Sequence, residues 1–454
     1  AEQNARQALG KVLDTDDPGA KIVALLDKSI THIKPGETFT YEQDIAPWLG
    51  EKVGLFATSF AEGSDPTILI ESTNDAAAMA SERKDSRDLG PAGSYKGHQY
   101  DKDTDGRVFG TAGGFAIYGP LAGFQQAVDA MNGESLGDSD DFKDAIGDLP
   151  DDRLGTFYTI PKTLISAIGE GQIDPSSQAL LEKSAGESLD KPISGALTAS
   201  PNSFDLEFVG GDNGVETPES ALLGDVPAQS WLALGIGDLG DVAKRSLDQL
   251  KGQIPNYDEA VRQIESTTGS SLDQLTDAFG DAALYVEGTT ESTLTGALVV
   301  QAKDPDLTGR LLSQLQGLLQ IGSSGGVRPL KLSGGGTGFE INDPSVAPAP
   351  IEIAQQADKL VIGYGPNSAE RTLTPTDTLA DSQPFSSAKG QVSDLGTDFF
   401  LDFPSVFQLA ESSGAESDPD YVKARKYIDA LSYLVSGSGT QDDQTELKAV
   451  LGLK

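Results

Sequence analysis

The sequence predicts an α+β protein made of two tandem copies of a mostly antiparallel sheet with helices packed against it. Short apolar runs with strand-like composition alternate with helical patterns along the whole chain. Turn-forming pairs such as Asp105-Gly106 and Pro201-Asn202 join consecutive runs, and such short turns connect antiparallel strands. A series of motifs also recurs in the second half, which indicates a duplication. We expect the helices to lie on one side of each sheet.

Four pairs of motifs carry the repeat, and they occur in the same order in both halves. The pairs are residues 45–50 with 275–280, 67–75 with 296–304, 118–120 with 364–366, and 154–156 with 395–397. In the second pair a closing Asp can cap the helix that follows, and in the third pair a Pro can open one. The motifs predict a first repeat at 1–212, a linker at 213–225 and a second repeat at 226–454.

The two repeats differ in one connection and at their beginnings. The second repeat is longer within residues 333–353, a Gly- and Pro-rich stretch where extra length costs little loop entropy. It also opens with a strand-like run at 226–234, whereas the first repeat begins directly in a helical pattern at 2–13. The first repeat therefore lacks its first strand. We expect the natural protein to carry that strand in a removed segment ahead of residue 1.

Composition excludes several classes of function. The chain has 70 acidic and 33 basic residues and a net charge of -37, which repels phosphate backbones and anionic membrane surfaces, so nucleic acid is not an expected partner. It has no Cys, which excludes disulfides, thiolate catalysis and Cys-ligated zinc. No apolar run approaches the roughly 18 residues that a membrane-spanning helix needs.

Two motifs of enzymes occur in contexts that argue against the enzymes. Gly235 to Gly240 reads GIGDLG, the spacing of a dinucleotide-binding turn, but Asp238 stands where the pyrophosphate would approach and no second strand follows the helix. Ser135 lies in a GxSxG sequence, yet both histidines, His32 and His98, precede it, whereas the hydrolase order places the His last. We interpret both segments as turns.

Asp101, Asp103 and Asp105 form the best candidate site for a metal. Their alternation, followed by Gly106, matches the first half of a calcium-binding loop, in which carboxylate oxygens point to one side. Position twelve of that loop would be Ala112 instead of a bidentate Glu, and the flanking segments have strand patterns. A hairpin turn with Asp-Gly at its corner explains the same residues, so calcium is the alternative interpretation and no other cofactor is expected.

The chain resembles the bacterial domain-of-unknown-function family thirty-three fifty-two. The resemblance rests on VPAQSWLALGIGDLG from residue 226, DAFG ending at Gly280, KDP ending at Pro305 and VIGYGP ending at Pro366, and it covers essentially the whole chain. It implies a secreted or cell-envelope protein of actinobacteria or cyanobacteria. The family has no assigned activity and no known catalytic residues, so the resemblance implies no site.

These observations together predict a secreted or cell-envelope, non-enzymatic protein that acts by binding a protein partner or by self-assembly. If the first repeat lacks its opening strand, the exposed sheet edge can accept a strand from another chain, which would build a fibre or a surface structure. Two alternatives stay open. One is a carrier of an apolar or lipidic ligand, which requires an apolar cavity of at least ~300 Å³. The other is a hydrolase that uses carboxylates or a bound cation.

Overall fold

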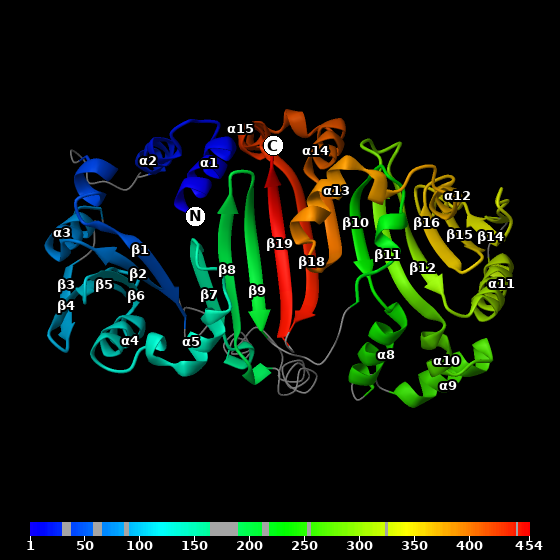
Figure 1. Ribbon diagram of the computed structural model, residues 1–454, viewed down its shortest axis with the longest axis horizontal. Helices are drawn as coiled ribbons and strands as arrows, with labels where there is room; N and C mark the ends of the chain where they lie inside the picture. Colours follow the sequence, from blue (N-terminus) through cyan, green and yellow to red (C-terminus); the bar gives the residue numbers. More distant parts are fainter. Residues whose placement is uncertain are drawn as a thin grey trace. The chain divides into compact units, whose positions relative to one another are not determined.

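The computed structural model describes residues 1–29, 38–57, 66–85, 90–163, 189–210, 218–251, 256–322, 326–441 and 444–454. The chain forms two compact units. The large unit comprises Ala1–Asp14, Pro150–Gly155 and Gly195–Lys454, and the small unit comprises Thr15–Leu149 and Thr156–Ser194. The strands pair antiparallel in two sheets, with helices between them in the sequence, which confirms the α+β class (Figure 1).

The sheet of the small unit has six antiparallel strands in the order β1-β2-β6-β5-β4-β3. The strands are β1 (Leu49–Phe56), β2 (Thr67–Ser72), β3 (Gly90–Tyr95), β4 (His98–Lys102), β5 (Arg107–Ala112) and β6 (Phe115–Pro120). The helices are α2 (Pro18–Ser29), α3 (Asp75–Asp85), α4 (Leu121–Asn132) and α5 (Asp140–Gly147), with short turns η1 (Tyr41–Ile45) and η2 (Leu136–Asp138). Gly113 and Gly114 form the two-residue turn between β5 and β6, and both have positive φ. Glycine adopts this conformation without strain because it has no side chain.

Helices cover both faces of this sheet, so the expectation of helices on one side is wrong. Val108 of β5 packs with Phe124 of α4 in one core cluster. Its neighbour Phe109 packs with Trp48 and with Ala78 of α3 in another. Successive side chains of a strand point to opposite faces, and because both are apolar here, both faces need cover.

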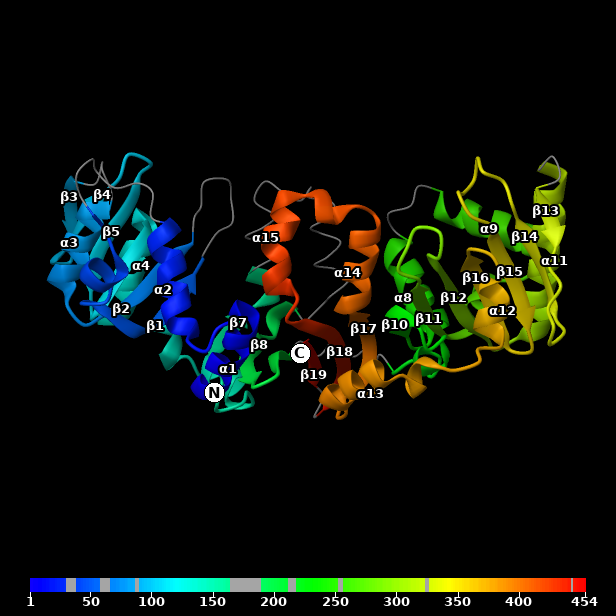
Figure 2. The same ribbon diagram turned by 90° about the horizontal axis from the view of Figure 1, so that it is seen from above.

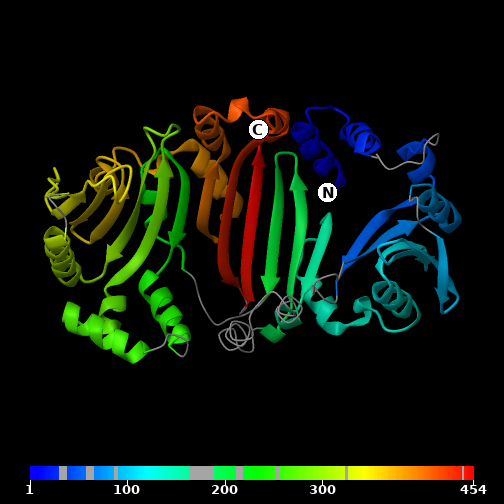
Figure 3. The ribbon, with the colours of Figure 1, turned by 180° about the vertical axis from the view of Figure 1, so that it is seen from behind.

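The sheet that runs through the large unit has thirteen strands in the order β13-β14-β15-β16-β12-β11-β10-β17-β18-β19-β9-β8-β7. The strands of the first repeat are β7 (Gly155–Thr159), β8 (Ile193–Ser200) and β9 (Ser203–Gly210). Those of the second are β10 (Ser230–Ile236), β11 (Phe279–Glu287), β12 (Thr295–Ala302), β13 (Val327–Pro329), β14 (Thr337–Ile341), β15 (Ile351–Gln356), β16 (Lys359–Tyr364), β17 (Gly396–Asp402), β18 (Leu431–Gln441) and β19 (Gln444–Leu453). Figure 3 shows β8, β9, β19 and β18 side by side. Strands β8 and β9 are joined by the turn expected at Pro201-Asn202.

The helices of the large unit also lie on both sides of its sheet. They are α1 (Glu2–Leu13), α8 (Leu239–Leu250), α9 (Tyr257–Thr268), α10 (Leu272–Asp277), α11 (Pro305–Gly322), α12 (Ser368–Leu373), α13 (Gln383–Lys389), α14 (Phe403–Ser412) and α15 (Pro419–Ile428), with short turns η4 (Leu223–Asp225), η5 (Leu379–Asp381), η6 (Gly390–Val392) and η7 (Ala415–Ser417). Figure 2 shows α13 and α14 on opposite sides of β18, and both contact it.

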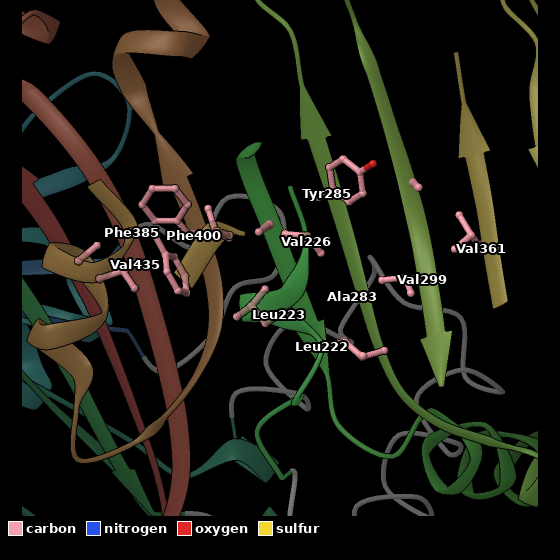
Figure 4. Close-up of a cluster of buried hydrophobic side chains, with 14 of the residues drawn as sticks. Leu222, Leu223, Val226, Ala283, Tyr285, Val299, Val361, Phe385, Phe400 and Val435 are labelled. Carbon is pink, nitrogen blue, oxygen red and sulfur yellow. The ribbon is translucent and has the colours of Figure 1, made fainter. Parts of the chain in front are cut away.

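The main core of the large unit joins side chains from distant parts of the second repeat (Figure 4). Phe385 of α13 meets Phe400 of β17 edge to face, with ring centroids 5.3 Å apart, a favoured geometry for aromatic pairs. Leu222 and Leu223, which lie in the expected linker, are buried in the same core, while residues 213–217 of that linker lie outside the described residues. The boundaries 1–212, 213–225 and 226–454 stay a prediction about the repeat.

The strand order reveals the repeat directly. The order β1-β2-β6-β5-β4-β3 of the small unit is matched by β11-β12-β16-β15-β14-β13 of the large unit. The extra residues of the second repeat lengthen the connections on either side of β14, a strand that lies within the expected insertion. The stretch 333–353 is therefore only partly loop. The second repeat also has β10 beside β11, as its sequence predicted.

Candidate functional site

The three aspartates proposed as metal ligands lie at the turn between β4 and β5. Asp101 is 2% exposed, and its two carboxylate oxygens accept hydrogen bonds from Arg83 Nε at 2.5 Å and Nη2 at 3.1 Å. Asp103 Oδ1 accepts from the Arg107 backbone N–H at 2.8 Å, and Asp105 is exposed at the corner, before Gly106 with its positive φ.

Two of the three aspartates are therefore bound within the protein: Asp101 to Arg83 of α3 and Asp103 to the backbone of the turn. An Arg guanidinium beside a carboxylate occupies the oxygens that a cation would need. Within the part of the chain that the structure describes, no three Asp, Glu or His side chains gather as a metal site would require. Calcium binding by Asp101, Asp103 and Asp105 stays a prediction, and the ion pair with Arg83 weighs against it.

Another part of the chain fills the space beside the GIGDLG segment. A Cβ atom on Gly237 would lie 1.8 Å from the carbonyl oxygen of Pro218, so another part of the protein occupies the space next to the turn. Asp238, in the left-handed conformation, caps α8 through Asp241 N–H and accepts from Lys303 Nζ at 2.9 Å. That ammonium group lowers the pKa of Asp238. These contacts weigh against a bound dinucleotide, and the absence of a cofactor at this turn stays a prediction.

Ser135 has a structural role as well. Its hydroxyl donates to Asp138 Oδ2 at 2.7 Å, and its backbone N–H donates to the same oxygen at 2.8 Å. This reciprocal pattern caps the short helical turn η2. A serine that is held as a helix cap is not presented as a nucleophile.

The large unit has an apolar groove on the face of its sheet opposite the main core. Leu284 of β11 stands opposite Leu298 of β12, which stands opposite Ile362 of β16. In the adjacent row Gly296 lies between Val286 and Tyr364, and all three residues line the groove. The volume is about 380 Å³, and Leu284 and Ile362 are 38% and 43% exposed. No motif in the sequence points to this groove, because an apolar run does not show which face of its strand stays open.

The outer edge of β1 is a second candidate binding surface, besides the apolar groove. In the described part of the small unit, β1 stands at one end of the sheet and pairs with β2 alone. Its counterpart β11 pairs with β12 on one side and with β10 on the other. Val53 and Leu55 of β1 are 70% and 65% exposed, which is unusual for large apolar side chains in a strand.

A buried charged group lies beneath α12 in the large unit. Glu287 is 2% exposed, and Arg371 Nη2 lies 2.6 Å from its Oε1. Burial raises the pKa of Glu287 in spite of this partner. Glu352, also buried, accepts from the backbone N–H groups of Asn367 and Ala369 and so caps the same helix. Glu352 is thus hydrogen-bonded within the core, whereas Glu287 has the ion pair with Arg371 and no hydrogen bond among the described residues. Neither carboxylate lines the apolar groove.

No helix within the described ranges combines the length and the apolar character needed to cross a membrane. No curated protein and no solved structure matches the chain. A family model described as "Protein of unknown function (DUF3352)" matches residues 121–448, which is well over half of the 454 residues. The chain therefore belongs to the DUF3352 family.

Proposed function

We propose that this protein is a non-enzymatic binding or assembly protein that takes up a strand from a protein partner along the outer edge of β1. One observation carries the proposal: the equivalent edge of β11 is occupied by β10, and β1 has no such neighbour among the described residues. Among the described residues, the same arrangement of strands thus occurs once with the edge strand and once without it. Strand addition to an open edge is a common mode of peptide recognition.

The physical chemistry of the edge supports this proposal. Alternate residues of an edge strand direct their N–H and C=O groups away from the sheet, where a further strand can bind them. The pairing of β1 with β2 is regular from Val53 to Phe56, whereas the N–H groups of Glu51 and Lys52 bind the side chain of Glu71 on β2. The regular stretch that a further strand can pair with therefore begins at Val53. An added strand would also cover the exposed Val53 and Leu55, and the burial of apolar surface favours binding.

We place this function outside the cell or in the cell envelope. The chain has no Cys and a net charge of -37, which suits a soluble surface in an exposed, oxidising location. The resemblance of the sequence to envelope and secreted proteins supports the same location.

The test compares the natural chain with two lysine variants. Electron microscopy and analytical ultracentrifugation measure the assembly of each. Leu55→Lys places a charge on the open edge. Leu447→Lys is the matched control, because Leu447 is 42% exposed but lies on β19, which is paired on both sides. We expect L55K to reduce self-association or partner binding and L447K to leave it unchanged. Equal association of both variants and the natural chain would refute the proposal, as would a natural chain that is monomeric and binds no strand peptide.

A second candidate function, carriage of an apolar ligand, is favoured by the groove of about 380 Å³ on β11, β12 and β16. Its volume exceeds the ~300 Å³ at which ligand pockets usually begin. The test measures the fluorescence of an apolar dye with Ile362→Gln, in the groove, and Leu318→Gln, an exposed position on α11. Binding that I362Q reduces and L318Q preserves would support a carrier. Equal fluorescence, together with no co-purifying ligand in native mass spectrometry, would exclude it.

A further inference from the structure

We infer that the strand taken up by β1 carries three consecutive apolar residues opposite Leu55, Gly54 and Val53, runs antiparallel to β1, and turns its central residue toward α4. This inference rests on the proposed function and specifies the chemistry of the partner. The structure contains its own template for the bound strand, because β10 occupies the equivalent place in the second repeat.

The register of the two sheets fixes which residues correspond. In the small unit Tyr118 stands opposite Ile68, which stands opposite Leu55. In the large unit Tyr364 stands opposite Gly296, which stands opposite Val286. Both tyrosines begin the Tyr-Gly motif that identifies the repeat. Leu55 is therefore the counterpart of Val286, one residue further along than the motif pair 45–50 and 275–280 would place it, and counting along the strands gives the next correspondences.

By this count Gly54 is the counterpart of Tyr285, and Val53 is the counterpart of Leu284. Opposite Val286, Tyr285 and Leu284, β10 places the residues Leu232, Ala233 and Leu234. All three are apolar. A strand that repeats this pairing on β1 presents an apolar side chain at each of the three positions.

The two faces of β1 impose different conditions on that strand. Gly54 lies on the same face as Leu69, since a Cβ on Gly54 would be 3.7 Å from Leu69 Cδ1, and Leu69 packs in the cluster that contains Phe124 of α4. The central residue of the added strand joins this covered face, as Ala233 does in the main core of the large unit. A charge there would lie beside the partly buried apolar side chains of Phe56 and Leu69, where its loss of hydration is unfavourable.

The outer two residues meet the open face. They lie beside Leu55 and Val53, which are 65% and 70% exposed, and a charge at these positions can still reach water. A lysine at the central position therefore weakens binding more than lysines at the outer positions. This ranking is the signature of the proposed register, because a strand that slips by one residue exchanges the two faces.

The test uses synthetic peptides with the full chain. The reference peptide has the core Leu-Ala-Leu between polar β-formers, and two others have the core Leu-Lys-Leu or Lys-Ala-Lys. We expect the reference to bind, the outer-lysine peptide to bind more weakly, and the central-lysine peptide to lose about tenfold or more in affinity, which corresponds to 1.4 kcal/mol. Binding should protect the backbone amides of β1 from hydrogen exchange. An amine-reactive group at the peptide's C-terminal end should label Lys52, because antiparallel pairing places that end beside it.

Three outcomes overturn the inference. Equal binding of all three peptides with protection of β1 would refute the apolar triplet and leave strand addition intact. Weaker binding by the outer-lysine peptide than by the central-lysine peptide would show the opposite register. Binding that leaves β1 unprotected, or that is as strong in L55K as in the natural chain, would refute both the inference and the proposed function.

Discussion

The hydroxyl oxygens of Tyr285 and Thr372 lie 2.8 Å apart in the closed interior of the large unit. Thr372 Oγ1 donates its own proton to the Ser368 carbonyl at 2.7 Å, so Tyr285 is the donor of the pair. Burial raises the pKa of Tyr285 to about 12, and the phenol therefore stays neutral in any physiological condition. The pair is a structural link between β11 and α12.

The direction of this hydrogen bond predicts unequal effects of two substitutions. Thr372→Val leaves the buried Tyr285 hydroxyl without an acceptor and should lower the free energy of unfolding by about 2 kcal/mol. Tyr285→Phe removes the donor together with its need for a partner and should cost about 1 kcal/mol. The double variant should be more stable than the sum of the two losses implies. Urea denaturation of the three variants measures this, and additive losses would contradict the pairing.

The two hairpin aspartates Asp101 and Asp105 should differ in their effect on the free energy of unfolding, because only Asp101 is buried. Asp101→Asn weakens the hydrogen bonds with Arg83 and should lower the free energy of unfolding by about 2 kcal/mol. Asp105→Asn changes an exposed turn residue and should stay within about 0.5 kcal/mol. We expect millimolar calcium to leave the melting temperature of the natural chain unchanged. A calcium-dependent increase that D105N abolishes would instead establish the metal site.

Gly237 tests the interpretation of the GIGDLG turn. Gly237→Ala places a methyl group against the Pro218 carbonyl and should lower the free energy of unfolding by about 2 kcal/mol. Gly317→Ala is the control, because Gly317 lies in α11 with nothing near its Cβ position, and Ala there should stabilise the protein by about 0.5 kcal/mol. If G237A were harmless, the space beside the turn would be open, and dinucleotide binding would need a direct test.

Glu287 and Glu411 should respond to pH in opposite directions. Burial holds the pKa of Glu287 above its usual value, so the stability that this group contributes is present in acid and is lost as the pH rises through the raised pKa. Hydrogen bonds from Arg425 and Tyr421 hold the pKa of Glu411 below its usual value, so its contribution is present above the ordinary carboxyl pKa and is lost as the pH falls.

Glutamine substitutions isolate the pH-dependent contributions of Glu287 and Glu411 to stability. From pH 4 to pH 7, E287Q should gain stability relative to the natural chain, whereas E411Q should lose stability relative to it. The measurement is the free energy of unfolding in urea at several pH values, with each variant compared to the natural chain so that the other carboxylates cancel. Parallel behaviour of the two variants would contradict the assigned causes of the pKa shifts.

Periodicity and turn chemistry predicted much of the fold. The strand at the start of the second repeat and the turns at Asp105-Gly106 and Pro201-Asn202 follow from local residue patterns, because period-two apolar runs and turn-forming pairs are local properties. Helices on both faces were not predicted, since consecutive apolar residues such as Val108 and Phe109 do not say what will cover each face. Strand β14 was missed because its Gly-rich flanks resemble a loop.

The candidate site depended more on tertiary structure. No local signal pairs Asp101 with Arg83, which lies on α3, or brings Leu284, Leu298 and Ile362 into one row across three strands. Such neighbours are determined by strand register, which a single sequence states only weakly. The unequal beginnings of the two repeats were visible in the sequence, but the strand pairings were needed to identify β1 as the affected edge.

The pairing of β9 with β19 has a consequence for how the large unit is made. Phe208 of β9 stands opposite Leu447 of β19, and nearly all of the second repeat is synthesised between them. On a ribosome, β9 emerges long before its neighbour exists, so this edge waits unprotected while β10 to β18 are produced. Contacts between such distant residues slow folding because a long loop must close first. The junction between β9 and β19 therefore forms only after the second repeat has been made, and chaperones that shield unpaired strands should matter most during that interval.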